Sequence, residues 1–183
     1  ATARGFLARW EVAGLCLVLL IGVALRVFQL DSVPAGTWFD EAQNGLEALR
    51  MLRDPSYRPV YIPELTQLPA LFFYGIALSF HFFGVSTWAV RLVATLIGIL
   101  TILFTYLLAK ELFDRRVALV SAFLLAVLPW HLNFSRFGMN GILTPYFAVL
   151  SMYLLARALR TRQWLDYVLA GLAVGLGMHG YLA

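Results

Sequence analysis

The stretch Ala89–Ala109, AVRLVATLIGILTILFTYLLA, decides the fold class of this 183-residue chain. A helix of about 20 mostly apolar residues crosses the hydrocarbon core of a bilayer, and Arg91, the one charge in this stretch, lies near its start. The whole chain has 61% hydrophobic and 13% charged residues, against roughly 45–50% and 25% in soluble domains. The sequence therefore predicts an all-α integral membrane protein.

The positions of the basic residues predict how the chain crosses the membrane. They form three clusters: Arg4/Arg9, Lys110/Arg115/Arg116 and Arg157/Arg160/Arg162. If all three lie on the cytoplasmic side, only one crossing separates the long loop after the first span from Lys110. Leu68–Phe83, short and bounded by Pro69 and Gly84, is then expected to be an interfacial helix. We expect five spans, over about 10–30, 88–109, 117–133, 142–159 and 164–182.

This topology places the N-terminus in the cytoplasm and residues 31–87 and 131–141 outside. We interpret residues 1–183 as the N-terminal part of a larger transmembrane module, with a C-terminal part absent, because the sequence begins without Met and stops inside an apolar run. The basic clusters account for the net charge of +4, so we expect a bilayer and no nucleic acid as partner. The single cysteine, Cys16, excludes a disulfide framework.

The outer loop carries an amphipathic helix over 38–53 that we expect to lie on the membrane. Ala42, Leu46 and Leu49 share one face at helical spacing, and Gln43 and Glu47 face away from it. Asp40 is expected at the start of this helix. It is either an N-cap that forms a capping box with Gln43, or, together with Glu41, an acidic pair that serves as general base or metal ligand.

Several motifs, in their order along the chain, resemble those of one family. They are Asp40-Glu41-Ala42, the segment 64–71, Phe83-Gly84 followed by Arg91-Leu92, the segment 110–116, Leu128-Pro129-Trp130, and Ser135-Arg136. The chain resembles the dolichyl-phosphate-mannose protein mannosyltransferase-like superfamily, which comprises GT-C glycosyltransferases of the family-39 and aminoarabinose-transferase type, and within it the bacterial Rgt-like branch. The similarity runs through essentially the whole chain.

The resemblance implies an inverting transfer of a hexosyl or pentosyl group on the extracytoplasmic side of a bacterial plasma membrane. The donor would be a polyprenyl-phosphate sugar, and the acceptor a lipid, a glycan or a protein. Asp40 matches the family's candidate base, and Glu41 is its neighbour. The resemblance also implies interfacial helices after the first span, in agreement with the charge pattern.

The chain departs from the family pattern in two places. The segment around Gln67 lacks the usual acid, so Glu64 would have to supply it. The second outer loop has Asn140 where many relatives carry an aspartate, which argues against a metal and against a two-carboxylate mechanism. We assign no metal ligand and no cofactor, although a divalent metal stays an open alternative.

Two arginines at the outer ends of spans are candidates for holding the donor phosphate. Arginine binds phosphate through bidentate hydrogen bonds without a divalent ion, and we expect this role for Arg136 first and Arg91 second. The alternative for each is an anchor that reaches the lipid headgroups. The expected substrate pocket comprises Glu64, Gln67, Asn140, His131 and Tyr181, although His131 and Tyr181 also fit ordinary interfacial residues.

Two other functions fit the same hydropathy. A transporter or flippase for a lipid-linked sugar would share the interfacial arginines, but transport sites usually place charges near the bilayer midplane, and no expected span carries a central acid. The chain could also be an inactive scaffold fragment whose site is completed elsewhere.

Overall fold

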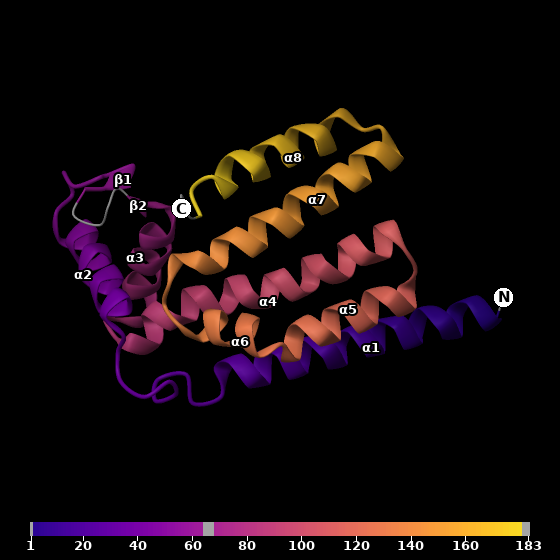
Figure 1. Cartoon of the computed structure of the whole chain (residues 1–183), viewed down its shortest axis with the longest axis horizontal. Helices are drawn as coiled ribbons and strands as arrows, with labels where there is room; N and C mark the ends of the chain where they lie inside the picture. Colours follow the sequence, from indigo (N-terminus) through magenta and orange to yellow (C-terminus); the bar gives the residue numbers. More distant parts are fainter. Residues whose placement is uncertain (1, 64–67, 181–183) are drawn as a thin grey trace.

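The computed structural model describes residues 2–63 and 68–180, and the side chains from residue 9 onward. In this part of the chain, long helices run side by side, and two shorter helices form a layer at one end (Figure 1). The elements are α1 (Thr2–Val27), α2 (Phe39–Arg53), β1 (Tyr61–Ile62), β2 (Leu68–Pro69), α3 (Leu71–Phe83), α4 (Thr87–Leu112), α5 (Arg115–Val127), α6 (Pro129–Arg136), the 3-10 turn η1 (Asn140–Ile142), α7 (Leu143–Thr161) and α8 (Trp164–Gly177).

Three described helical segments are long and apolar enough to span a membrane: Arg9–Val27, Thr87–Leu112 and Asn140–Thr161. The pair α5 and α6 makes a fourth if it counts as one bent span. We predicted five spans; α8, which we counted as the fifth, is a shorter apolar helix of 14 residues. Helix α3 has 13 residues, too few to cross about 30 Å at 1.5 Å per residue. The chain is thus an all-α integral membrane protein.

The expected single span over 117–133 is broken instead. Helices α5 and α6 meet at an angle of 58°. Leu128, between them, is extended, with φ −62° and ψ 118°, because the ring of the following proline disfavours the helical conformation there. Pro129 then occupies the first turn of α6, where its missing N–H costs nothing. The break turns α6 across the outer end of the bundle.

Helix α4 is the centre of the bundle. It contacts α1, α5 and α6 on one side and α3 and α7 on the other. Ser86 caps its start by accepting a hydrogen bond from the Ala89 N–H at 3.2 Å, which satisfies a free donor of the first turn. Two apolar clusters surround α4, one with α1 and α5 and one with α2, α3 and α7.

The outer layer consists of α2 and α3, with the two-residue strands β1 and β2 paired antiparallel beside them. Helix α2 exposes Ala42 and Leu46, as an amphipathic helix on a membrane would. Its other face does not point to water as the spacing suggested. Glu47 is buried there and accepts a hydrogen bond from the Tyr57 hydroxyl at 3.1 Å, because residues 54–63 fold back over this face.

Close packing of α6 against α4 depends on Gly98. A Cβ atom at this position would lie 2.6 Å from the Ser135 Cβ. We expect Gly98→Ala to lower the unfolding free energy by about 1–3 kcal/mol, because the helices must separate. Gly171→Ala on α8, where no atom lies within 4 Å, is the matched control and should be neutral or stabilising by up to about 1 kcal/mol. Thermal unfolding of the purified full-length protein measures both, and equal losses would contradict this packing.

Candidate active site

The connector between α1 and α2 is held by two buried arginines. Arg136 on α6 donates to the carbonyls of Leu25 at 2.6 Å, Phe28 at 2.8 Å, Gln29 at 3.3 Å and Val33 at 2.7 Å. Arg91 on α4 donates to the carbonyls of Leu30 and Pro34 at 3.0 Å and of Gly36 at 2.6 Å. Because this connector has no regular secondary structure, the arginines supply the partners that its carbonyl groups need.

Arg91 also forms a buried ion pair with Glu41. Its Nε lies 2.8 Å from Glu41 Oε1 and its Nη2 lies 3.0 Å from Oε2, and both side chains are fully buried. All five N–H donors of Arg91 are thereby used. We predicted a phosphate-binding role for Arg91, but this arrangement leaves it no donor for a phosphate, and we do not carry that role forward.

Glu41 joins three parts of the chain. Besides the pair with Arg91, it accepts hydrogen bonds from the Trp38 N–H at 3.0 Å and from the Gly138 N–H at 2.9 Å. Burial alone would raise the pKa of this carboxyl, but the Arg91 guanidinium and the two N–H groups outweigh it and lower the pKa below its usual value. Glu41 is therefore a buried carboxylate that positions the start of α2, and it has no open side for a substrate.

Asp40 has a different environment. The residue that caps α2 is Trp38, and Glu41 accepts the Trp38 N–H, so the expected capping box of Asp40 and Gln43 is wrong. Asp40 is exposed, and its carboxylate has no hydrogen bond or ion pair among the described residues. A free carboxylate thus stands at a fixed helix start, at the end of the bundle that carries α2 and α3.

The second outer loop lies against this helix start. The Asn44 side chain donates to the Gly138 carbonyl at 2.8 Å, and the Gly138 N–H binds Glu41. A Cβ on Gly138 would collide with Val90 of α4, so only glycine lets the loop approach this closely. Asn140 donates to the Gly180 carbonyl at 3.2 Å and connects the same loop to the end of α8.

An aromatic cleft of about 340 Å³ opens next to the start of α2. Trp38, two residues before Asp40, forms one wall, and α6 with the loop after it forms the other through Trp130, Asn133, Phe134, Phe137 and Met139. The rings of Trp130 and Phe134 stack with centroids 6.3 Å apart. This cleft could not be predicted from the sequence, since its walls are almost a hundred residues apart in the chain.

His131, another predicted pocket residue, has its partner inside the bundle. His131 is buried, and its Nδ1 lies 2.9 Å from Arg26 Nη2, so it accepts from an arginine inside the bundle instead of facing a substrate. Glu64, Gln67 and Tyr181 lie outside the described residues. Among the described residues, no group of three or more His, Cys, Asp or Glu side chains could hold a metal ion.

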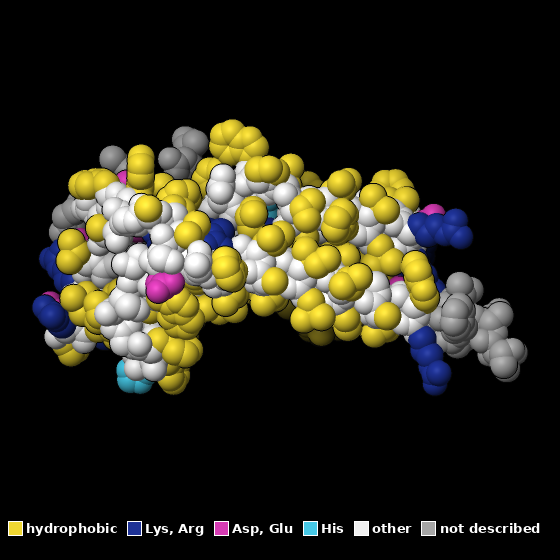
Figure 2. Space-filling model, turned by 90° about the horizontal axis from the view of Figure 1, so that it is seen from below, with side chains coloured by type: hydrophobic (Ala, Val, Ile, Leu, Met, Phe, Trp, Pro, Cys, Tyr) yellow, Lys and Arg dark blue, Asp and Glu magenta, His cyan; other side chains and the backbone are white. Residues whose placement is uncertain are grey.

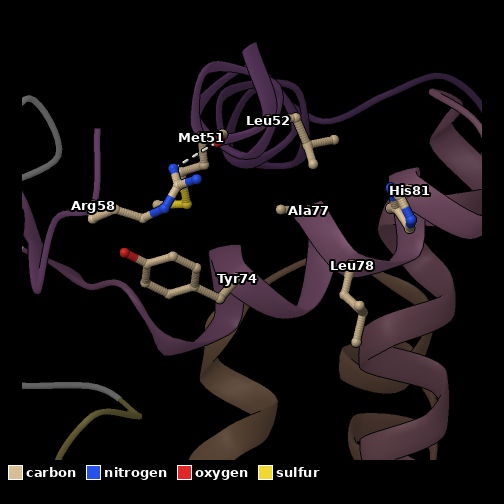
Figure 3. Close-up of a pocket in the computed structure, with 7 residues that line it drawn as sticks. All are labelled: Met51, Leu52, Arg58, Tyr74, Ala77, Leu78 and His81. Carbon is tan, nitrogen blue, oxygen red and sulfur yellow. Dashed lines mark hydrogen bonds between the residues drawn. The ribbon is translucent and has the colours of Figure 1, made fainter. Parts of the chain in front are cut away.

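A second hollow, of about 240 Å³, lies between α2 and α3 (Figure 3). Arg58 and His81 line it at opposite ends, with Tyr74 and Met51 between them. Met51 is eleven residues after Asp40 on α2, which is about 16 Å along a helix that rises 1.5 Å per residue. This hollow is therefore separate from the surface around Asp40.

The family model described as "Dolichyl-phosphate-mannose-protein mannosyltransferase" matches residues 67–182, more than half of the chain. The chain belongs to this family. The Bacillus subtilis (strain 168) protein named "Putative mannosyltransferase YkcB" is 30% identical over 97 residues, which cover 53% of this chain and 14% of that relative. No solved structure matches the chain.

The family match includes α3 to α8, and with them Arg91, Arg136 and the loop at Gly138. It begins after α2, so Asp40 and Glu41 lie outside the matched segment. The contacts of Glu41 with Arg91 and Gly138 nevertheless connect the helix that carries both acids to the matched part.

We expect Arg91→Ala to destabilise the protein by about 3–5 kcal/mol, because it leaves the Glu41 carboxylate buried without its cation. Thermal unfolding of the full-length protein measures this loss. Arg53→Ala, which removes an exposed arginine at the end of α2, is the control and should shift the midpoint little. Equal effects of the two changes would mean that the buried pair does not hold the outer layer.

The ion pair should also make stability depend on pH. A carboxyl whose pKa is lowered in the folded state adds stability above its unfolded pKa of about 4.5, and this stability is lost as the pH falls toward the lowered value. At pH 7 the wild type should unfold at a higher temperature than Glu41→Gln, and the gap should narrow below about pH 4.5. A gap that stays constant from pH 7 to pH 3 would refute this assignment.

Proposed function

We propose that this protein is a glycosyltransferase that takes a sugar from a polyprenyl-phosphate donor and transfers it, with inversion, to an acceptor on the extracytoplasmic side. The observation that carries the proposal is the free carboxylate of Asp40 on a helix start that Glu41, Arg91 and Gly138 hold in place. Membership of the mannosyltransferase family supports the reaction class.

In the proposed step, the Asp40 carboxylate takes the proton of an acceptor hydroxyl. The hydroxyl oxygen forms a bond to the anomeric carbon of the sugar, and the bond between that carbon and the phosphate oxygen breaks. The phosphate leaves with the electron pair, and a single displacement inverts the configuration. A general base of this kind contributes about 10²–10⁴-fold to a rate.

The leaving phosphate needs a positive charge close by. Arg136 has no carboxylate partner among the described residues, but its terminal nitrogens are bound to carbonyls of the α1–α2 connector. We infer that it stabilises the phosphate through the field of its charge more than through a bidentate contact. In the proposal, Arg136 thus still stabilises the phosphate, but through its charge. Glu41 serves as a positioning residue.

The basic residues support the proposed side of the membrane. The end of α4, the start of α5 and the end of α7 lie at the end of the bundle opposite α2 (Figure 1), and they carry Lys110, Arg115, Arg157 and Arg160. The positive-inside rule makes that end cytoplasmic. Asp40 and the aromatic cleft then lie at the outer surface, where a lipid-linked donor can present its sugar, and the lipid, glycan or protein acceptor would approach from outside.

Asp40→Asn tests the proposal, because it removes the base and changes neither Glu41 nor the cap. Membranes with the full-length protein are given a panel of radiolabelled polyprenyl-phosphate sugars, and transfer of label is measured. We expect a loss of about 10²–10⁴-fold in Asp40→Asn. Asp31→Asn, which alters an exposed acid of the connector, should keep most of the activity.

Two results would contradict the proposal. If the Asp40→Asn variant transferred label as fast as the wild type, Asp40 would be excluded as the base. A folded wild-type protein that transfers no label from any donor, but moves a lipid-linked sugar across the bilayer, would establish the transporter instead.

A further inference from the structure

The end of the bundle opposite Asp40 combines seven basic and four acidic described side chains. Figure 2 shows Lys and Arg side chains projecting from this end, beyond the yellow hydrophobic surface of the helices. The basic residues are Arg9, Lys110, Arg115, Arg116, Arg157, Arg160 and Arg162, and the acidic residues are Glu11, Glu111, Asp114 and Asp166. The proposed reaction uses none of them.

The ion pairs at this end share one orientation, with the acid inside and the base outside. The side chains of Glu11, Glu111 and Asp166 are only 10%, 13% and 5% exposed. Their basic partners are far more open: Lys110 is 42% exposed, Arg115 56%, Arg157 43% and Arg160 66%. The carboxylates therefore hold the helices together, while the surface that they leave to the surroundings is cationic.

A groove of about 410 Å³ opens in this surface between the ends of α4 and α7. Lys110, Glu111 and Arg160 form its rim, and Leu107 and Tyr153 form its deeper part. Beneath the rim the walls become apolar, since the Tyr153 ring lies 5.9 Å from that of Phe104. Cations at the rim and largely apolar side chains about one to two turns deeper match a molecule with an anionic head and a hydrocarbon tail.

The ion pairs leave the rim free to bind an anion. Arg160 binds Glu111 through Nε, and through Nη2 at 3.2 Å. The Nη1 of Arg160 donates to no described residue, and the side chain is two-thirds exposed. The Nζ of Lys110 contacts Glu11, and this ammonium group carries three N–H donors. Each cation can thus donate a hydrogen bond to a phosphate oxygen without giving up the contact that holds its helix.

We propose that this groove is a binding site for the headgroup of an acidic phospholipid. The phosphate would lie between Lys110 and Arg160, and the acyl chains would follow α4 and α7 into the bilayer. A basic pocket between membrane helices at the headgroup level has the charge and the depth that such a lipid requires. The site is independent of the proposed transfer reaction, which takes place at the other end of the bundle.

The test is native mass spectrometry of the full-length protein in detergent, titrated with dioleoylphosphatidylglycerol or dioleoylphosphatidylcholine. We expect the first equivalent of the anionic lipid to bind saturably and the zwitterionic lipid to bind weakly. Arg160→Gln should weaken the anionic lipid at least about fivefold, as expected for one basic residue near a headgroup. Arg160→Lys, which keeps the charge, should bind nearly as well as wild type.

The matched control is Arg116→Gln, which removes one exposed charge from the same end but outside the groove. Equal weakening in Arg116→Gln and Arg160→Gln would overturn the proposal, because the attraction would then be diffuse. Equal binding of the two lipids, or equal loss in Arg160→Lys and Arg160→Gln, would also overturn it, because charge would not govern the binding. Displacement of the lipid by glycerol 1-phosphate at similar concentration would assign the groove to a soluble anion.

Discussion

The buried pair of Arg91 and Glu41 is the interaction on which the outer half of the molecule depends. A charge inside a protein must be paired and hydrogen-bonded, and here the bonds come from four separate segments: α4, the connector after α1, the start of α2 and the loop at Gly138. The buried pair thus connects these four segments to one another. The short α2 is thereby fixed against α4 and the loop at Gly138, although its own length would not stabilise it.

The need to pair the buried charge of Arg91 also places the two neighbouring acids, Asp40 and Glu41, in different environments. Neighbouring residues on a helix point about 100° apart, so one can face the protein while the other faces outward. Glu41 takes the buried position and satisfies Arg91, the Trp38 N–H and the Gly138 N–H. Asp40 is left free at a site whose geometry its neighbour determines. In the proposed reaction, a reactive carboxylate and a structural one thus come from two adjacent residues.

Hydropathy predicted the membrane class, because this class depends on helix length and local composition. The interfacial positions of α2 and α3 stay predictions. The roles of single arginines could not be predicted in this way. Arg91 and Arg136 looked like residues at span ends that could reach a phosphate. Their partners, the carbonyls of residues 25–36, lie 55 or more positions away in sequence, and no periodic pattern records such contacts. The break at Leu128, by contrast, could have been read from Pro129 alone.

The two ends of the molecule differ in which charged side chains are buried. At the outer end, the guanidinium groups of Arg26, Arg91 and Arg136 are inside and are compensated mainly by backbone carbonyls. At the other end, the carboxylates are inside and the cations outside. Buried cations leave positive potential beneath the outer surface, where a phosphate would leave during transfer, while exposed cations meet headgroups directly. In the two proposals, each end of the bundle therefore binds a different anionic ligand, although both ends are built from the same apolar helices.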